Sequence, residues 1–499
     1  MTRDLQTLSR RWNAALVPLL AALVLAGCAT APAELPPVNA PAQFKEQGAA
    51  VAPKEGTWTR AQPAEAQPRG EWWRAFNDPV LDALVERADA NNTTLQGAAA
   101  RLAEARALAR STDADRAPQI GVGAGANRAA GLDRVQSPNA QTLLTAGANV
   151  SYEVDLFGRL SQASDAARLD ADARAGLLQS TKLLVEAETA QTYLSLRALD
   201  AERALVRESV DAYRDTLRLT QRRYQAGDLA ELDVARVETE VAATESDALT
   251  LDRQRAETEH ALAVLVGDTA SNFGLRTDAW SAALPVIPAG IPGTVLARRP
   301  DISAAQKSVL AAQARVGVAQ AAWFPDISLT GGAGYASSTA GDLFKWSARS
   351  WGIGALLSLP LFDGGRREAG VQSASAQLDG ALASYRTQVL TAVKEVEDQL
   401  SALRILDAQS EVQAKAVASA TRATALSDSR YRNGYVSQLD LLDARRSELR
   451  NRRQALQVRS AQYQATVGLI RALGGGWETA VAEAAPAGQS FKAATRSPT

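Results

Sequence analysis

Residues that could carry out covalent or catalytic chemistry are scarce in this chain. Its 499 residues include one cysteine, Cys28, and one histidine, His260. A single cysteine can form neither an internal disulfide nor a zinc site made of cysteines. His260 lies in a run predicted to be helical, where one imidazole without partners is more often a surface residue than a metal ligand or a base. We therefore expect no enzyme activity, no catalytic residue, no metal site and no cofactor.

Cys28 has surroundings that predict attachment of a lipid. Residues 3–11 hold three arginines, and the apolar stretch 14–25 that follows is shorter than the about 20 residues that a membrane-spanning helix needs. The sequence Leu25-Ala26-Gly27-Cys28 is similar to the bacterial lipobox, which implies cleavage before Cys28 and acylation of its thiol. A buried core cysteine is the alternative, but the flanking residues are not core-like. Ala29 follows in place of an aspartate, which in enteric-type sorting implies passage to the outer membrane.

Composition and charge narrow the classes of protein further. Hydrophobic residues make up 46% of the chain and charged residues 22%, but aromatic residues only 5%, which favours thin, helix-rich packing over a broad core. The net charge is −1, and removal of residues 1–27, with three arginines and one aspartate, brings it to about −3. Such a chain offers no strongly basic surface, so we expect no nucleic-acid partner.

The sequence repeats itself with an offset of 207 residues, as from 223 to 430. Arg223-Tyr224-Gln225-Ala226-Gly227 is matched by Arg430-Tyr431-Arg432-Asn433-Gly434, and Pro118-Gln119-Ile120 is matched by Pro325-Asp326-Ile327. Self-similarity at a fixed offset predicts a tandem duplication of one structural unit. We therefore expect a signal peptide at 1–27, a lipid-anchored extended segment at 28–71, structural repeats at 72–268 and 294–476, a linker at 269–293 and a flexible tail at 477–499.

Each repeat contains two stretches with the period-two alternation of β-strands. From Thr142 to Val154, for example, apolar residues such as Leu144 and Val150 alternate with small or polar ones. Each stretch is near the roughly 9 to 11 residues that a tilted membrane strand needs. One chain has too few strands to close a barrel, and hydrocarbon does not tolerate open sheet edges, so several chains must pool their strands if the sheet enters a membrane. The pattern leaves open two chains, three chains, or a soluble sheet packed on the helices.

Most of the remaining sequence is predicted to be helical. Residues 159–225 and 366–433 contain no proline, and the glycines that follow, Gly227 and Gly434, are typical of helix caps. At about 1.5 Å per residue, each helix would be on the order of 100 Å long. The helices expected at about 231–266 and 80–116 are roughly half as long. Two short helices laid end to end match a long one, which favours a hollow cylinder of antiparallel helices capped by a barrel.

Four motifs, in order, give the chain a family resemblance. They are Trp72-Trp73-Arg74-Ala75-Phe76-Asn77-Asp78-Pro79-Val80-Leu81, Asn91-Asn92-Thr93-Thr94-Leu95, Arg298-Arg299-Pro300-Asp301-Ile302 and Pro360-Leu361-Phe362-Asp363-Gly364-Gly365. From about Trp72 to Gly476 the chain resembles the outer membrane factor (TolC-like) family, and more narrowly the NodT-type lipoproteins that serve resistance-nodulation-division efflux pumps. The resemblance implies a mainly α-helical homotrimer. Its tandem repeats would form a long periplasmic tunnel capped by a 12-stranded membrane β-barrel shared by three chains.

The same resemblance assigns roles to carboxylates near the turns between helices. Residues aligned with Asp440 and Asp443 form the constriction of the resting channel, and the residue aligned with Asp233 helps to lock it. Three copies of such carboxylates around one axis would attract cations and repel anions. The alternative is that they are solvated first-turn residues that favour the positive end of a helix, and both roles can hold together. In relatives an arginine near the position of Val436 ties the tips together, and this chain has valine there.

The turns and the ends of the strands also have expected roles. By resemblance, the tips that face the periplasm and contact an adaptor are Arg223, Tyr224, Gly227, Arg430, Tyr431 and Gly434. The bend from barrel to tunnel is expected at Gly158, Gly364 and Gly365, because small residues let the backbone turn sharply.

Together with the lipid predicted at Cys28, the resemblance implies a passive exit duct in the bacterial outer membrane, anchored by lipid, with its tunnel in the periplasm. The expected partners are two further copies of the chain, a periplasmic adaptor (membrane fusion) protein, an inner-membrane resistance-nodulation-division transporter and outer-membrane lipid. Because a wide duct selects little, we expect the pump to choose the drug or other small molecule. Two alternatives stay open: the exit duct of a type I protein secretion system, and a lipid-anchored coiled-coil scaffold without a pore.

Overall fold

A computed structural model describes residues 43–46, 70–129, 140–278, 280, 282, 284–285, 287 and 292–475. Cys28, the signal peptide, the expected tail and most of the expected anchored segment lie outside these residues. The chain falls into two compact units, each made of several stretches of sequence. The first contains Thr93–Lys182 and Arg299–Lys394, and the second contains Gln43–Asn92, Leu183–Arg298 and Glu395–Thr499.

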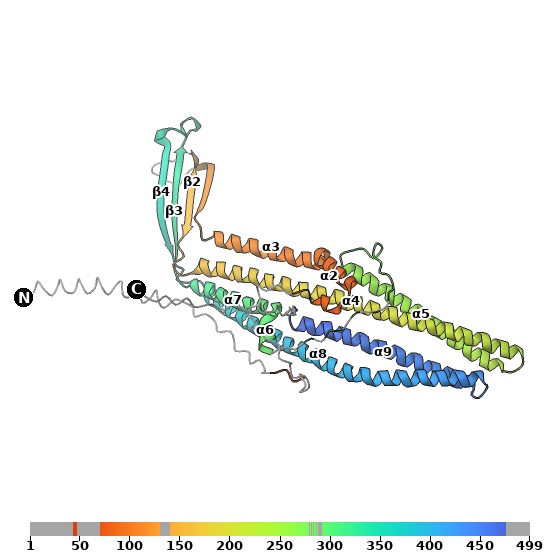
Figure 1. Cartoon of the computed structure of the whole chain (residues 1–499). Coiled ribbons are helices and arrows are strands. Elements are labelled where there is room, and N and C mark those ends of the chain that lie inside the picture. Colours follow the sequence, from red (N-terminus) through yellow and green to blue (C-terminus); the bar gives the residue numbers. More distant parts are fainter. Residues whose placement is uncertain are drawn as a thin grey trace, which may run out of the picture. The chain divides into compact units, whose positions relative to one another are not determined.

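Most of the described chain is helical, and its long helices come in matched pairs (Figure 1). The pairs are α3 (Thr93–Ala114) and α7 (Pro300–Ala321), each of 22 residues, α4 (Arg159–Gln225) and α8 (Arg366–Arg432), each of 67, and α5 (Glu231–Leu265) and α9 (Gln438–Ala472), each of 35. The members of each pair begin 207 residues apart, as residues 159 and 366 do. Within the described ranges, no helix combines the length and apolar content needed to cross a membrane.

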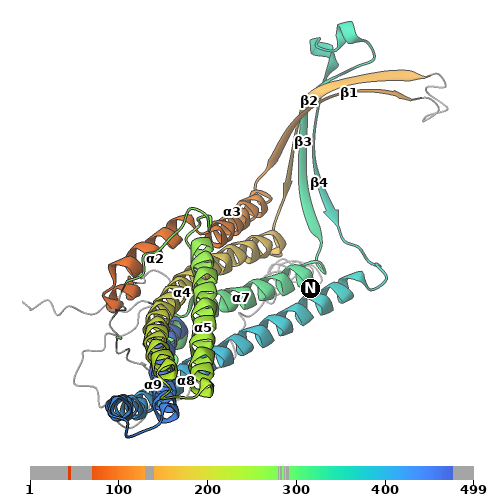
Figure 2. The same cartoon turned by 90° about the vertical axis from the view of Figure 1, so that its right-hand side faces the viewer.

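The first unit carries one antiparallel sheet in the order β1-β2-β3-β4 (Figure 2). Its strands are β1 (Gln119–Ala129), β2 (Gln141–Glu153), β3 (Asp326–Ser337) and β4 (Arg349–Ser358). β2 of the first repeat pairs with β3 of the second, with Gly147 opposite Gly334. β1 and β4 lie at the edges of the sheet. An open edge presents unpaired backbone N–H and C=O groups, which hydrocarbon cannot satisfy.

The two faces of the sheet differ as the alternation predicts. One face carries the large apolar side chains, of which Val122, Trp351 and Ile353 are 87%, 78% and 85% exposed. The opposite face is made of small residues, and one row across its four strands consists of Gly123, Gly147, Gly334 and Ser350. Such exposure means that the helices of the unit leave the apolar face uncovered. This argues against a soluble sheet packed on the helices.

Both long helices end at a glycine with a left-handed backbone. Gly227 has a φ of 82° and Gly434 a φ of 75°. After α4, the N–H of Gly227 donates to the C=O of Tyr224 and the N–H of Asp228 donates to the C=O of Arg223, both at 2.9 Å. This pair of hydrogen bonds defines a Schellman cap, and the turn after α8 repeats it. The caps predicted from the sequence are therefore confirmed.

The single helix expected at about 80–116 is wrong, because the chain forms α2 (Pro79–Asn91) and α3 with a break at Asn92. Asn92 has an extended backbone and is 4% exposed. Its side-chain amide donates to the C=O of Leu265 at the end of α5 (2.8 Å). The last carbonyls of a helix have no partner within the helix, so this contact satisfies one of them and accounts for the break. The second repeat is divided in the same way, between α6 (Pro292–Arg298) and α7.

Candidate functional site

Asp440 lies in the first turn of α9 as part of a capping box. The Ser437 hydroxyl accepts a hydrogen bond from the Asp440 N–H (3.2 Å), and the Asp440 carboxylate accepts one from the Ser437 N–H (3.0 Å). The Ser437 hydroxyl also donates to this carboxylate (2.7 Å). The hydrogen bonds from Ser437 hold the pKa of the exposed Asp440 carboxyl below its usual value. The first-turn role expected for Asp440 is therefore present in the single chain.

Asp443 lies one turn further along α9, beside an arginine that also contacts α5. Its carboxylate is 62% exposed and lies 3.2 Å from Nη1 of Arg446. Nη2 of the same Arg446 donates to Glu240 of α5, whose side chain is 14% exposed. The two leucines between Asp440 and Asp443 are buried. α9 therefore turns both aspartates to its exposed side and links one of them to the first repeat.

Asp233 lies in the first turn of α5. Its side chain is 26% exposed, and its carboxylate is 3.7 Å from Nη1 of Arg236 on the same helix. Asp233, Asp440 and Asp443 thus each have a partner nearby in their own sequence. The constriction expected at these three residues would form between copies of the chain, and it stays a prediction.

The tips combine exposed side chains with one buried tyrosine. Tyr431 is 4% exposed, and the guanidinium of Arg223 lies 5.1 Å from the centre of its ring. This cation–π contact joins the end of α4 to the end of α8. Tyr224 and Arg430, also expected at the tips, are exposed. Exposed apolar residues next to them are Leu232, Tyr435 and Leu439.

At their opposite ends, the long helices are joined to the sheet through glycine and aspartate. Gly158 precedes α4 with a φ of 75°, and Gly364 and Gly365 precede α8 with φ of 66° and 89°. These left-handed backbones are suited to a sharp turn. Asp155 and Asp363 lie in corresponding connections, and each accepts hydrogen bonds from two backbone N–H groups at the start of its long helix. The sequence predicted the glycines but not the capping role of the aspartates.

Below the tips, buried polar side chains join α9 to α4. Gln438 is 5% exposed, and its amide donates to the hydroxyl of Thr220 (2.8 Å). Arg445 donates from Nη1 to a backbone C=O of α4 (2.9 Å). Sequence reasoning missed these residues. The arginine pair at 445–446, repeated seven residues later at 452–453, is the signal in the sequence that points to them.

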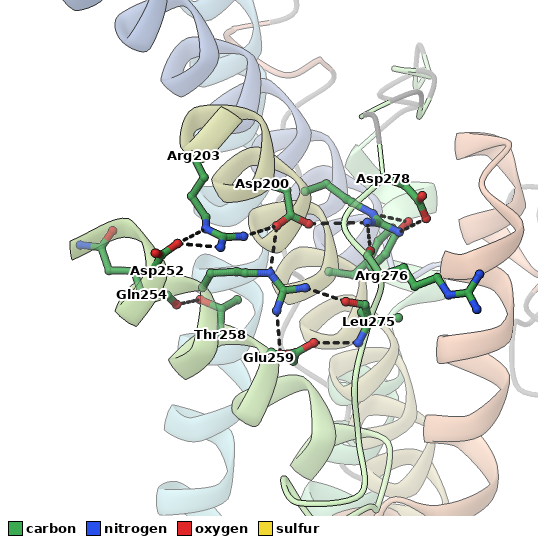
Figure 3. Close-up of polar contacts among 12 residues, drawn as sticks. Asp200, Arg203, Asp252, Gln254, Thr258, Glu259, Leu275, Arg276 and Asp278 are labelled. Atoms are coloured by element: carbon green, nitrogen blue, oxygen red, sulfur yellow. Dashed lines mark hydrogen bonds and ion pairs between the residues drawn. The ribbon is translucent and has the colours of Figure 1, made fainter. Parts of the chain in front are cut away.

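A second buried polar cluster surrounds Asp200 of α4 (Figure 3). The Asp200 side chain is 1% exposed and accepts hydrogen bonds from Arg255 of α5 (2.9 Å) and from Arg203 (3.2 Å), while Arg197 lies 3.6 Å away. Arg255 also donates to the C=O of Leu275 (2.7 Å), which lies in the segment between the repeats. The cluster therefore fastens this segment to α4 and α5. Sequence reasoning missed it too, although the spacing of three residues between 197, 200 and 203 is a signal for it.

Metal-ligating side chains do not gather in the described part of the chain. Among those residues, no group of three or more His, Cys, Asp or Glu could hold a metal ion. His260 is exposed on α5. The charged groups described above instead form helix caps and ion pairs within and between helices.

The chain is similar in sequence to known proteins. The model of a family described as outer membrane efflux protein matches residues 84–268 and 291–475. The pyoverdine export outer membrane protein OpmQ of Pseudomonas aeruginosa is 32% identical over 468 residues, which cover 92% of this chain and 96% of that protein. The cation efflux system protein CusC of Escherichia coli is 31% identical over 466 residues, which cover 93% of this chain and 99% of that protein.

Solved structures agree with these matches. The outer-membrane channel OprN is similar with a TM-score of 0.82 and 30% identity, covering 90% of this chain and 99% of that chain. The outer membrane protein VceC from Vibrio cholerae is similar with a TM-score of 0.76 and 29% identity, covering 82% and 99%. The fold class predicted from the sequence, mainly α-helical with a long helical tunnel and a membrane β-barrel, is confirmed by these likenesses.

Proposed function

We propose a function for this chain on the premise that it belongs to the outer membrane efflux protein family, whose model matches both repeats. The chain is the outer-membrane channel of a tripartite efflux system and acts without catalysis as a passive exit duct. An inner-membrane resistance-nodulation-division pump delivers drugs or other small molecules to it through a periplasmic adaptor. Export proteins and efflux channels among the relatives support this proposal.

The observation that carries the proposal is a four-stranded sheet with two open edges and an uncovered apolar face. Pairing of β4 in one copy with β1 in the next removes both edges. Three copies of four strands then make the 12-stranded barrel of a homotrimer. The apolar face, with Val122 and Trp351, would contact lipid, and the row of small residues through Gly147 would line the bore.

The gate of this duct lies at the turns between the helices. Asp440 and Asp443 are exposed in the single chain, on the side of α9 opposite its buried leucines. In the trimer they would approach their copies around the axis, with Asp233 helping to lock the tips. Like carboxylates in a narrow bore bind cations and repel anions. The capping of α9 by Asp440 is compatible with this role, because the carboxylate is exposed while it caps.

The adaptor binds at the tips in this proposal. The residues concerned are those of the two Schellman turns, Arg223, Tyr224, Gly227, Arg430, Tyr431 and Gly434. Tyr224 and Arg430 supply the accessible side chains, whereas the contact between Arg223 and Tyr431 keeps the turns together. Cys28, near the start of the sequence, carries the lipid that places the protein in the outer membrane.

Planar-bilayer recordings of the purified full-length protein test the proposal. We expect ion conductance, and a trimer by light scattering. A monomer without conductance would favour a scaffold without a pore and overturn the proposal. In cells, disruption of the gene should increase retention of a fluorescent pump substrate. Unchanged retention together with loss of a secreted protein would instead favour a type I secretion duct.

A further inference from the structure

We propose that Arg446 is the positioning residue of the channel constriction, because it holds Asp443 of the second repeat against Glu240 of the first. The inference rests on the function proposed above and says what holds Asp443 of the proposed constriction in place.

The guanidinium of Arg446 has two partners on different helices. Nη1 lies 3.2 Å from Oδ1 of Asp443, one turn earlier on α9, and Nη2 donates to Oε1 of Glu240 on α5. Arg446 is 41% exposed and Glu240 is 14% exposed, so the bond to Glu240 is the better shielded of the two. An outward displacement of Asp443 from α5 therefore has to break or stretch the bridge through Arg446.

The packing around this bridge makes the start of α9 part of the first hairpin. Leu442 is buried with Tyr213 of α4 and with Val237 and Val241 of α5. Burial is the main reason that the pKa of Tyr213 rises to about 12. These apolar contacts fix the distance between α9 and the α4–α5 pair. Arg446 then connects the exposed aspartate to that packed core.

A second arginine of α9 makes an equivalent contact with α5. Arg453 lies seven residues after Arg446 and contacts Asp247, seven residues after Glu240, at 3.0 Å. Nε of Arg453 also donates to Glu202 of α4 (2.7 Å). Two arginine–carboxylate contacts, seven residues apart on each helix, thus join α9 to α5. The contact nearer the tip, made by Arg446, is the one that also includes Asp443.

Arg450 offers a matched control. It lies on α9 one turn after Arg446 and lines the same hollow of about 480 Å³ as Glu240 and Arg453. Within the described chain it makes no hydrogen bond or ion pair. Arg450→Ala therefore removes the same charge from the same helix face without removing a bridge.

Resting conductance in planar bilayers tests the inference, with the Asp440→Ala/Asp443→Ala double variant as the open reference. We expect Arg446→Ala to raise the resting open probability about two- to fivefold, the change that loss of one partly exposed ion pair predicts. Arg450→Ala should leave it unchanged. Glu240→Ala should also raise it, and Glu240→Ala/Arg446→Ala should raise it no further than Arg446→Ala alone, because both single changes break the same bridge.

The outcomes separate this inference from the proposed function. If the open reference conducts strongly while Arg446→Ala behaves like the wild type, the inference is overturned and the duct stands. If the effects of Glu240→Ala and Arg446→Ala simply added in the double variant, with trimers intact by light scattering, the bridge to Glu240 would be overturned. If no variant conducts at all, both the duct and the inference fail.

Discussion

Gly147 and Gly334 face each other across β2 and β3 at a place where neither residue has room for a side chain. A Cβ atom on Gly147 would lie 2.7 Å from the carbonyl oxygen of Ala333, and one on Gly334 would lie 2.6 Å from Cα of Gly147. Both contacts are with backbone atoms, which cannot swing aside as the end of a flexible side chain can. A glycine inside a strand often marks such a close approach of two backbones.

Gly334→Ala should therefore weaken the pairing of β2 with β3 by about 1–3 kcal/mol, the usual cost of overpacking. This pairing joins the strands of the two repeats, so the trimer should dissociate at a lower temperature in a detergent gel. Gly332→Ala is the control, because it lies two residues away on the same strand and a Cβ there would be 3.7 Å from its nearest neighbour. Equal dissociation temperatures for the two variants would contradict the prediction.

Replacing Asp440 and Asp443 together by alanine should raise the resting conductance and reduce block by divalent cations, because it removes the carboxylates from the proposed constriction. Asp440→Ala alone also removes the capping box, so the two roles have to be separated. Ser437→Ala removes the hydroxyl that caps the Asp440 N–H but keeps the carboxylate. If Ser437→Ala reduced cation block as much as the double variant does, the cap rather than the charge would be responsible.

Several elements of this fold could be predicted from local sequence patterns, each for an identifiable physical reason. The alternation between 142 and 154 gave β2, because successive side chains on a strand point to opposite faces. Gly227 and Gly434 gave the helix ends, because their left-handed backbones are costly for other residues. The break at Asn92 was not predicted, since its cause is the carbonyl of Leu265, a partner 173 residues away.

The contacts around the candidate site were not predicted either, because their partners are also far apart in the sequence. Arg446 and Glu240 are 206 residues apart, and each looks like a solvated charge on its own helix. They come together through tertiary packing, such as that of Leu442 with Tyr213 and Val237. Pairing of long helices is set by such tertiary contacts, for which one sequence provides no partner information. The candidate aspartates Asp233, Asp440 and Asp443, in contrast, were identified through the family resemblance of the tip motifs.

Cys28→Ala should abolish incorporation of labelled fatty acid, because the chain has no other cysteine. Conductance of the reconstituted protein should persist, since the strands of the proposed trimer would hold it in the membrane without the lipid. Metabolic labelling followed by a bilayer recording of the same variant measures both. Label that persists in Cys28→Ala would refute the assignment of the lipid to this residue.

Asp200→Ala should destabilise the second unit by about 3 kcal/mol, because it leaves arginines buried without their carboxylate. Arg255 would lose a partner at 2.9 Å, and the segment around Leu275 that it holds should become easier to cleave. Chemical denaturation and limited proteolysis measure the two effects. Asp211→Ala is the control, since its carboxylate is 76% exposed and 3.5 Å from Arg214. Similar losses in both variants would contradict a buried cluster.

Asp301 should make the first unit sensitive to acid. Burial alone would raise the pKa of its carboxyl, but hydrogen bonds and charge from Arg299, with further hydrogen bonds from the Ile302 N–H and from Gln388, outweigh burial and hold the pKa below its usual value. Nη2 of Arg299 lies 2.6 Å from Oδ2 of Asp301, and Nε2 of Gln388 lies 2.5 Å from it. A carboxyl whose pKa is lower in the folded protein stabilises the fold above its unfolded pKa, and this stabilisation is lost as the pH falls through the folded value.

Asp301→Asn should therefore lower the free energy of unfolding by about 2 kcal/mol at pH 7, where the wild type keeps its charged pair. The two proteins should converge only as the pH falls through the folded pKa of Asp301, which lies below the ordinary aspartate range, because the wild-type carboxyl is protonated there as well. Asp379→Asn is the control, since this exposed residue of α8 has no hydrogen bond or ion pair within the described chain. A difference between wild type and Asp301→Asn that did not shrink in acid would mean that the lost contact is one of packing and not of charge.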